Sequence, residues 1–233
     1  MGELRLIEEI CETLQSAQNG AGRVLAALAG PPGAGKSTFS SKLVSALKGT
    51  GDLSLAAVVP MDGFHLENDV LQARGLLQSK GAPETFDVSG FVDLVRQVRR
   101  DDGPVAYPLF DRAADRTIAG AATLESTTRF VIFEGNYLLL QKGAWAQLAA
   151  LFDVTIMLHV DAEKLRARLV RRWIEHGLDQ NTAVARADGN DMQNAQLVLA
   201  HSGTPDLKVI TLPDDQLVLE TQASRAGMLA ERK

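Results

Sequence analysis

A glycine-rich segment at positions 30–38 holds the residues best suited to chemistry. It reads GPPGAGKST and satisfies the pattern G-x-x-x-x-G-K-[ST], which binds the phosphate groups of nucleotides. Gly33 and Gly35 allow backbone geometry that residues with a β-carbon resist, so N–H groups can point inward at an anion. Lys36 supplies a cation to the β- and γ-phosphates, and Ser37 offers a hydroxyl to Mg²⁺. The predicted nucleotide ligands are Gly30, Pro31, Pro32, Gly33, Ala34, Gly35, Lys36, Ser37 and Thr38.

A phosphate loop of this kind needs a strand before it and a helix after it, and the flanking residues predict both. An apolar run at 24–29 precedes the loop. A helical pattern at 36–48 follows it and adds unpaired amides and the positive end of a helix dipole. The same alternation continues along the chain. Further strands are predicted at 55–61, 130–133, 154–160 and 207–212, and further helices at 88–100, 162–176 and 180–200.

This alternation predicts an α/β protein with a three-layer P-loop NTPase fold, in which helices flank a mainly parallel sheet. The apolar runs are nearly continuous, as expected of strands buried on both faces. Around 75–83 and 103–120 the pattern gives way to polar and turn residues, and we expect these insertions to form a substrate pocket. We predict a single domain over 1–212 and a tail of uncertain order at 213–233.

Composition and charge exclude several classes of function. A formal net charge of -5 argues against a nucleic-acid partner, although a nucleotide can bind where positive groups converge. The single cysteine, Cys11, cannot form an intramolecular disulfide, and its spacing from Leu14 places it on the apolar face of a helix. The chain shows no secretory pattern and no run of about 18 apolar residues. We therefore expect a cytoplasmic protein with no membrane partner.

Four further segments resemble the superfamily of P-loop kinases that contains uridine kinase, phosphoribulokinase and bacterial pantothenate kinase. They are PMDGFHL at 60–66, RGLLQSKGAPETFD at 74–87, FEGNYLLL at 133–140 and RLVRRWIEHG at 168–177. The resemblance implies a kinase that transfers the γ-phosphoryl group of ATP, with Mg²⁺, to a hydroxyl of a small polar metabolite. It also implies a lid that closes over the reacting groups, in addition to the substrate-loop insertions.

The resemblance assigns roles to individual residues. Asp62, in the D-G-F motif, is the expected acceptor of the substrate's hydroxyl proton, and Glu134 is the expected neighbour of the metal ion. Arg168 and Arg171 lie in the segment similar to the arginine-bearing lid helix, and with Asp62 and Lys36 they form the expected catalytic set. The residues predicted to contact the substrate are His65, Arg74, Tyr107, Asp111, Arg112 and Asp115.

Several of these residues also have a purely structural interpretation. Arg168 and Arg171 could belong to a solvated helix face, which is the usual explanation of basic clusters, and for Arg172 the two interpretations are equally balanced. His65 could be a packed structural residue rather than a substrate contact. The charged loop at 111–116 could form surface salt bridges instead of gripping hydroxyls or an anionic group.

The substrate positions depart from those of the two best-known groups. Uridine kinases carry an Asp and a His where this chain has Gly81 and Asp115, and a tyrosine where it has Phe110. Pantothenate kinases carry a histidine where it has Tyr107. The FDRAADR and FEGNYLLL segments look like short bacterial kinases named after fructose transport systems. A sugar such as fructose is therefore the first candidate acceptor.

Two alternatives stay open. The acceptor could be a nucleoside or pantothenate, or the chain could be a regulatory P-loop NTPase whose bound nucleotide only sets a conformation and which would not need Asp62. A GTPase is disfavoured, because no N-K-x-D motif occurs. The expected partners are ATP and a small-molecule acceptor. Related kinases are often dimers or tetramers, which leaves a homodimer open.

Overall fold

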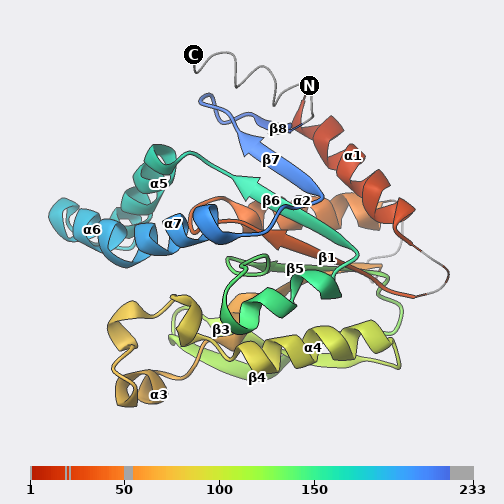
Figure 1. Ribbon diagram of the computed structural model, residues 1–233, viewed down its shortest axis with the longest axis horizontal. Coiled ribbons are helices and arrows are strands. Elements are labelled where there is room, and N and C mark those ends of the chain that lie inside the picture. The colour runs from red at the N-terminus through yellow and green to blue at the C-terminus, as the bar shows by residue number, and fades with distance from the viewer. Residues whose placement is uncertain (1, 19, 21, 50–54, 221–233) are drawn as a thin grey trace.

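A six-stranded sheet forms the centre of the computed structural model (Figure 1). The structure describes residues 2–18, 20, 22–49 and 55–220. The strands lie in the order β2-β5-β1-β6-β7-β8; all neighbouring pairs are parallel except β7 with β8. Their bounds are β1 Val24–Ala29, β2 Ala56–Pro60, β5 Phe130–Gly135, β6 Val154–His159, β7 Leu207–Thr211 and β8 Leu217–Leu219.

Helices cover both faces of this sheet. Their bounds are α1 Glu3–Ser16, α2 Lys36–Lys48, α3 Asn68–Ala73, α4 Val88–Arg100, α5 Ala162–Glu175, α6 Gln180–Arg186 and α7 Met192–His201. Because successive strand residues point to opposite faces, Val24 belongs to the core cluster that includes residues of α1 and α2, whereas its neighbour Leu25 belongs to the cluster that includes residues of α4. Every residue of β1 is buried, which explains its unbroken apolar sequence. The prediction of an α/β fold with helices flanking a mainly parallel sheet is confirmed.

The predicted helix boundaries hold at 36–48 and 88–100 but not at 180–200. The last range contains α6 and α7, and the turn that joins them, Ala187–Asp191, is π-helical. The apolar period continues through both helices, so a sequence pattern does not reveal the wider turn. The N-terminal helix α1 is amphipathic as predicted, and Cys11 lies in the core, where burial raises its thiol pKa to about 11.

The polar insertion at 103–120 folds into most of a two-stranded antiparallel hairpin, formed by β3 Val105–Asp111 and β4 Arg116–Leu124, whose second strand continues beyond the insertion. Most residues of β4 are exposed or half-buried, so the strand lacks the apolar alternation that would have predicted it. The Asp111 carboxylate caps the turn by accepting from the backbone N–H groups of Ala113 and Ala114. The hairpin carries Phe110 and Arg112 to the end of the central sheet.

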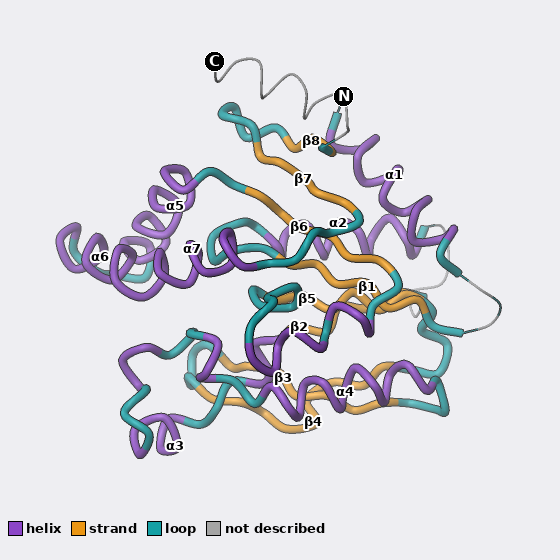
Figure 2. Tube along the Cα trace, viewed as in Figure 1, coloured by secondary structure: helices purple, strands orange, loops and turns teal. Residues whose placement is uncertain are grey.

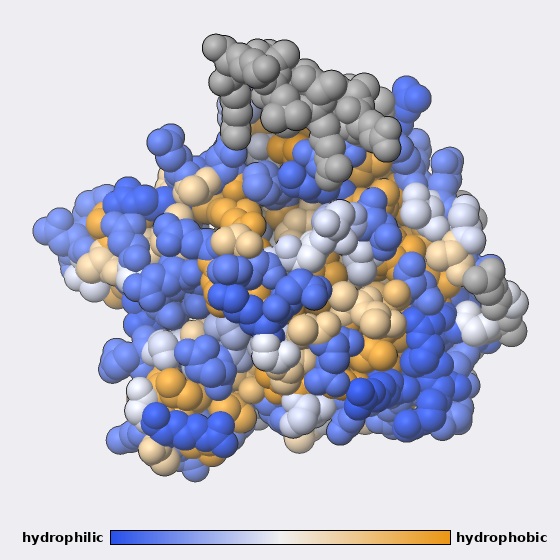
Figure 3. Space-filling view, in the orientation of Figure 1, coloured by the Kyte–Doolittle hydropathy of each residue, from blue (hydrophilic) through white to orange (hydrophobic). Residues whose placement is uncertain are grey.

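The segment predicted as a tail at 213–233 is described only as far as Glu220. Its first residues turn back and form β8 against β7, and residues 221–233 lie outside the described part of the chain. No helix among the described residues is long and apolar enough to cross a membrane. The face shown in Figure 3 is largely hydrophilic, and its hydrophobic side chains lie in scattered small areas.

The loops at the carboxyl ends of the strands lie together at one edge of the sheet. The phosphate loop follows β1, a 3-10 turn at Met61–Phe64 follows β2, and α5 follows β6. In Figure 2, helices α5, α6 and α7 form one lobe at this edge, and the segment around α3 forms another. We refer to α5–α7 as the lid helices. In open α/β sheets this edge is where ligands bind.

Candidate active site

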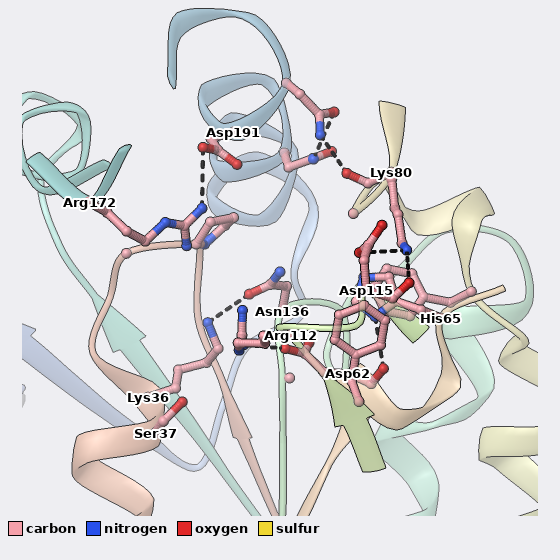
Figure 4. Close-up of a pocket in the computed structure, with 18 of the residues that line it drawn as sticks. Lys36, Ser37, Asp62, His65, Lys80, Arg112, Asp115, Asn136, Arg172 and Asp191 are labelled. Carbon is pink, nitrogen blue, oxygen red and sulfur yellow. Dashed lines mark hydrogen bonds and ion pairs between the residues drawn. The ribbon is translucent and has the colours of Figure 1, made fainter. Parts of the chain in front are cut away.

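A cavity of about 670 Å³ lies at the carboxyl edge of the sheet, and most of its lining is polar. One side comes from the phosphate loop and the end of β5, and a second from the turn after β2, the α3 region and the β3–β4 hairpin. The lid helices supply the third side. Figure 4 shows Lys36 and Ser37 on one side of this space and Asp62, His65 and Lys80 on the other.

The phosphate loop has the backbone that its sequence predicts. Gly33 and Gly35 have φ angles of +80° and +87°, which favour glycine. Gly35 caps the N-terminus of α2, so the first amides of that helix are available to an anion. The Lys36 ammonium is buried and donates to the Pro31 carbonyl at 3.0 Å and to Asn136 Oδ1 at 2.6 Å. Burial lowers the Lys36 pKa to about 8, although Glu134 and Asp62 oppose the shift.

Oxygen ligands suited to Mg²⁺ lie beside this lysine. The Ser37 hydroxyl donates to Glu134 Oε1 at 2.9 Å, and the Ser40 hydroxyl lies 3.4 Å from Glu134 Oε2. No cluster of three or more His, Cys, Asp or Glu side chains that could hold a metal occurs within the described residues. Mg²⁺ usually keeps several waters and takes one or two protein oxygens together with phosphate oxygens. The Ser37 and Glu134 pair therefore fits that ion when nucleotide is bound.

Asp62 reaches the cavity from the turn after β2. A β-carbon at Gly63 would collide with the Pro108 carbonyl, so glycine in the D-G-F motif lets this turn lie directly against the hairpin. Asp62 Oδ2 pairs with Arg112 Nη2 at 2.5 Å. The Arg112 side chain is 73% exposed and Asp62 is half-buried, so the pair sits at the cavity mouth rather than in the core. Asp62 thus presents a carboxylate across the cavity from the phosphate loop.

His65 is held between two aromatic rings. Its ring centroid lies 4.1 Å from that of Phe86 and 4.6 Å from that of Phe110. Burial lowers the His65 pKa, although Asp62 opposes the shift, and this favours the neutral form of the ring. Nδ1 lies 2.8 Å from the Asp62 carbonyl, which can only accept, so Nδ1 carries the proton. The other nitrogen, Nε2, keeps a lone pair that can accept from a ligand hydroxyl.

Lys80 anchors a polar network on the same side. Its ammonium donates to Asp115 Oδ1 at 2.8 Å and to Asn68 Oδ1 at 2.7 Å, and it lies 4.9 Å from the centre of the Phe110 ring. Asn68 also donates to Asp115 Oδ2 at 2.8 Å. Burial raises the Asp115 pKa, but the hydrogen bonds from Lys80 and Asn68 outweigh it, so the net shift is downward. Asp115 therefore remains an anion that shares the Lys80 charge.

Of Arg168, Arg171 and Arg172 on α5, only Arg172 belongs to the lining of the cavity. Arg168 donates to the Gly33 carbonyl at 3.3 Å and pairs with Asp215 at 2.6 Å, outside the lining of the cavity. Arg171 is exposed and lies 3.6 Å from Glu175, also outside the lining. Arg172, which the sequence left evenly balanced, lines the cavity.

The other predicted site residues divide between the cavity and its surroundings. Those in its lining are Pro32, Gly33, Gly35, Lys36, Ser37, Thr38, Asp62, His65, Arg112, Asp115 and Glu134. Outside it, Arg74 follows the last residue of α3, and the hydroxyl of the buried Tyr107 donates a hydrogen bond to the Val58 carbonyl. Asp111 caps the hairpin turn, so none of these three is part of the lining.

Sequence reasoning missed several residues that line the cavity. They are Asn68, Lys80, Asn136, Trp173, Arg186, Asn190, Asp191 and Asn194. Asn136 and Lys80 lie inside two of the segments that carry the family resemblance, and that resemblance is the signal that could have identified them. The polar residues of the lid helices carry no signal beyond ordinary surface polarity, because only the fold turns them toward the phosphate loop.

Comparison with known proteins supports a kinase. No family model matches the chain. The chain is 37% identical over 195 residues to a Schizosaccharomyces pombe protein named "Putative uridine kinase", and the match covers 79% of this chain and 82% of that protein. It is 33% identical over 150 residues to a pantothenate kinase of Clavibacter michiganensis, which covers 64% of this chain and 46% of that enzyme.

A solved structure agrees with these sequence matches. The crystal structure of a protein from Silicibacter sp. TM1040, described as a "putative fructose transport system kinase", superimposes with a TM-score of 0.82 at 48% sequence identity. The match covers 87% of this chain and 98% of that protein. The fold, the phosphate loop and these relatives therefore all indicate a P-loop kinase.

Proposed function

This chain belongs to the superfamily of P-loop kinases that contains uridine kinases and bacterial pantothenate kinases, and from that premise we propose that it phosphorylates a hydroxyl of a small neutral metabolite with MgATP. The observation that carries the proposal is a single cavity lined both by Lys36 and Ser37 and by the Asp62 carboxylate. A module that only senses nucleotide would need the first part of this cavity but not the second. An acceptor pocket beside the phosphate loop favours group transfer.

In the proposed reaction, the phosphate loop holds the nucleotide and Asp62 holds the acceptor. The amides at the start of α2 and the Lys36 ammonium bind the phosphates. Mg²⁺, held by Ser37 and Glu134, would neutralise charge on the phosphate oxygens. Asp62 accepts a hydrogen bond from the acceptor hydroxyl, which orients that oxygen toward the γ-phosphorus, and takes its proton late in the transfer. Positioning and charge neutralisation supply most of the rate.

The charges around Asp62 favour a neutral acceptor. Arg112 pairs with Asp62, and Lys80 pairs with Asp115, so the two cations in this part of the cavity are each matched by a carboxylate. The neutral His65 offers an unprotonated Nε2. The Asp62 carboxylate and the His65 imidazole can accept hydrogen bonds from the O–H groups of a polyol, whereas a carboxylate or phosphate on the substrate would find both Arg112 and Lys80 already paired with carboxylates. We therefore infer a polyhydroxylated acceptor, of which a sugar such as fructose is one example.

An acceptor screen with matched pairs tests this proposal. Each neutral compound is compared with its charged counterpart: glucose with gluconate, and fructose with fructose 6-phosphate; uridine and pantothenate complete the set. ADP formation and the mass of the product are measured with MgATP. We expect a neutral sugar or polyol to give phosphorylated product, with kcat/KM at least about tenfold above that of its charged counterpart, a difference of about 1.4 kcal/mol.

Other outcomes would redirect the assignment. Preferential phosphorylation of uridine or pantothenate would replace the neutral polyol with that acceptor while keeping the kinase. A slow ATP consumption that no acceptor stimulates would favour the regulatory NTPase instead.

A further inference from the structure

One turn of the lid helices departs from α-helical geometry and contributes neighbouring side chains to the cavity. This π-helical turn, Ala187–Asp191, joins α6 to α7. Such turns are rare and are frequent at functional sites. Its last two residues, Asn190 and Asp191, both line the cavity but have different partners.

Asp191 holds two side chains of α5. Its Oδ2 accepts from the Trp173 indole Nε1 at 2.6 Å and lies 3.4 Å from Arg172 Nη2. The Asp191 residue is only 9% exposed. Burying a carboxylate is costly unless it is paired and hydrogen-bonded. The indole alone could be satisfied by a neutral amide, so the negative charge at this position is explained by the arginine.

Trp173 in turn lies beside two cations that line the cavity. The guanidinium groups of Arg172 and Arg186 lie 5.1 and 4.8 Å from the centre of its ring. Arginine over a tryptophan ring is a favourable contact that also restricts the guanidinium. Asp191 holds both the Trp173 indole and the Arg172 guanidinium. One carboxylate therefore orders the side of the lid that faces the phosphate loop.

Asn190 connects the same turn to the acceptor side of the cavity. Its Nδ2 donates to the Lys80 carbonyl at 2.8 Å, and its Oδ1 accepts from Asn194 at 3.2 Å. Lys80 belongs to the network with Asp115. The π-helical turn thus contacts both the segment that lines the acceptor pocket and the arginine that lies across from it.

We propose that Asp191 is a positioning residue that holds Arg172 for the transferring phosphoryl group, and that the π-helical turn sets this arginine relative to the acceptor pocket through Asn190. The inference rests on the proposed kinase function. A guanidinium that is already oriented stabilises charge in the transition state without reorganising at the moment of transfer. Loss of Asp191 should therefore lower kcat more than it changes the KM for ATP.

A double-mutant cycle tests this role. Asp191→Asn keeps an oxygen that can accept from Trp173 but removes the charge that holds Arg172. We expect Asp191→Asn to lower kcat about tenfold, a loss whose free-energy equivalent lies within the usual coupling energies of neighbouring residues. The KM for ATP should change less than about twofold. In an Arg172→Ala background the same substitution should have little further effect, because the group it positions is gone.

Asp188→Asn is the matched control. Asp188 lies in the same turn, but it is exposed and pairs with Arg166 at 2.6 Å. Removing its charge should leave kcat and KM unchanged. Thermal unfolding of each variant reports folding, so that a loss of structure is not mistaken for a loss of positioning.

The outcomes separate the inference from the proposed function. Additive effects of the Asp191 and Arg172 substitutions would overturn the positioning role. So would an Asp191→Asn variant that unfolds at lower temperature but turns over normally below that temperature. If the wild-type protein phosphorylates no acceptor, the proposed function fails and the inference fails with it.

Discussion

The Lys36 ammonium donates a 2.6 Å hydrogen bond to Asn136 Oδ1, which joins the phosphate loop to the residue that follows β5. Its hydrogen bonds go to two neutral oxygens, those of the Asn136 side chain and the Pro31 carbonyl. Burial therefore lowers the Lys36 pKa to about 8, with Glu134 offsetting part of the shift. The phosphates of a bound nucleotide would supply the negative charge that this buried cation lacks.

The first prediction follows from this lowered pKa. Phosphate oxygens favour the ammonium form, so bound MgATP should raise the Lys36 pKa. At a pH between about 8 and this raised pKa, MgATP binding should therefore be accompanied by uptake of a proton. Affinity should be full below about pH 8 and should fall as the pH rises above it, because protonation then costs part of the binding free energy. Calorimetry in buffers of different ionisation enthalpy measures both the MgATP affinity and the number of protons taken up on binding.

A substitution at the partner tests the cause of this pH dependence. Asn136→Asp places a carboxylate beside the ammonium, so the Lys36 pKa should rise and the onset of the affinity loss should move to higher pH. An unchanged onset would show that Lys36 does not control the transition. Lys36→Ala should abolish the proton uptake altogether.

The second prediction concerns Lys36 itself. Lys36→Ala should abolish phosphoryl transfer and weaken MgATP binding by about 1.5–3 kcal/mol, the usual contribution of a hydrogen bond to a charged group. The fold should survive, because the substitution removes a buried charge whose partners are neutral oxygens. Turnover, calorimetric affinity and thermal unfolding should be measured on one preparation. Wild-type turnover by the folded variant would remove the nucleotide site from this loop.

The third prediction separates a kinase from a nucleotide binder. Asp62→Asn keeps the size of the side chain but removes the proton acceptor, so transfer should fall by roughly 10²- to 10⁴-fold while ATP affinity changes little. The loss should be near the lower limit if the hydroxyl proton leaves late. Product formation and nucleotide binding are the two measurements. Near-normal transfer with intact binding would exclude Asp62 from the reaction, and lost binding would place it near the metal.

Arg112→Ala is the matched partner of Asp62→Asn. It removes the other half of the ion pair but leaves the carboxylate in place. We expect it to change the KM for the acceptor more than kcat, because the exposed guanidinium sets the charge at the cavity mouth. If both substitutions lower kcat equally, the two residues act as one unit.

The fourth prediction ranks the arginines of α5. Arg172→Ala should lower turnover most, by up to roughly 10³-fold if its charge stabilises the transferring group. Arg171→Ala should have little effect, because that side chain is exposed and lies outside the cavity lining. Arg168→Ala should weaken ATP binding more than it slows turnover, since Arg168 contacts the Gly33 carbonyl of the phosphate loop. Equal losses for Arg171 and Arg172 would contradict this ranking.

The sequence by itself determined the α/β fold and the nucleotide side of the cavity. The phosphate loop is continuous in the chain, and its function depends on local backbone geometry that Gly33 and Gly35 already specify. Asp62 and Glu134 could be predicted for a related reason. Both stand at or next to the carboxyl ends of parallel strands, and the topology of such a sheet brings those ends together.

Only the tertiary structure decided which polar groups complete the site. The sequence pattern predicts that Arg168, Arg171 and Arg172 lie on one helix. Which of them faces the cavity depends on how that helix, α5, packs against the phosphate loop. Asp191 lines the cavity because it lies in a π-helical turn, and no apolar pattern in the sequence predicts that turn. The Lys80 network joins residues from three separate segments, and contacts between distant segments depend on packing rather than on local sequence.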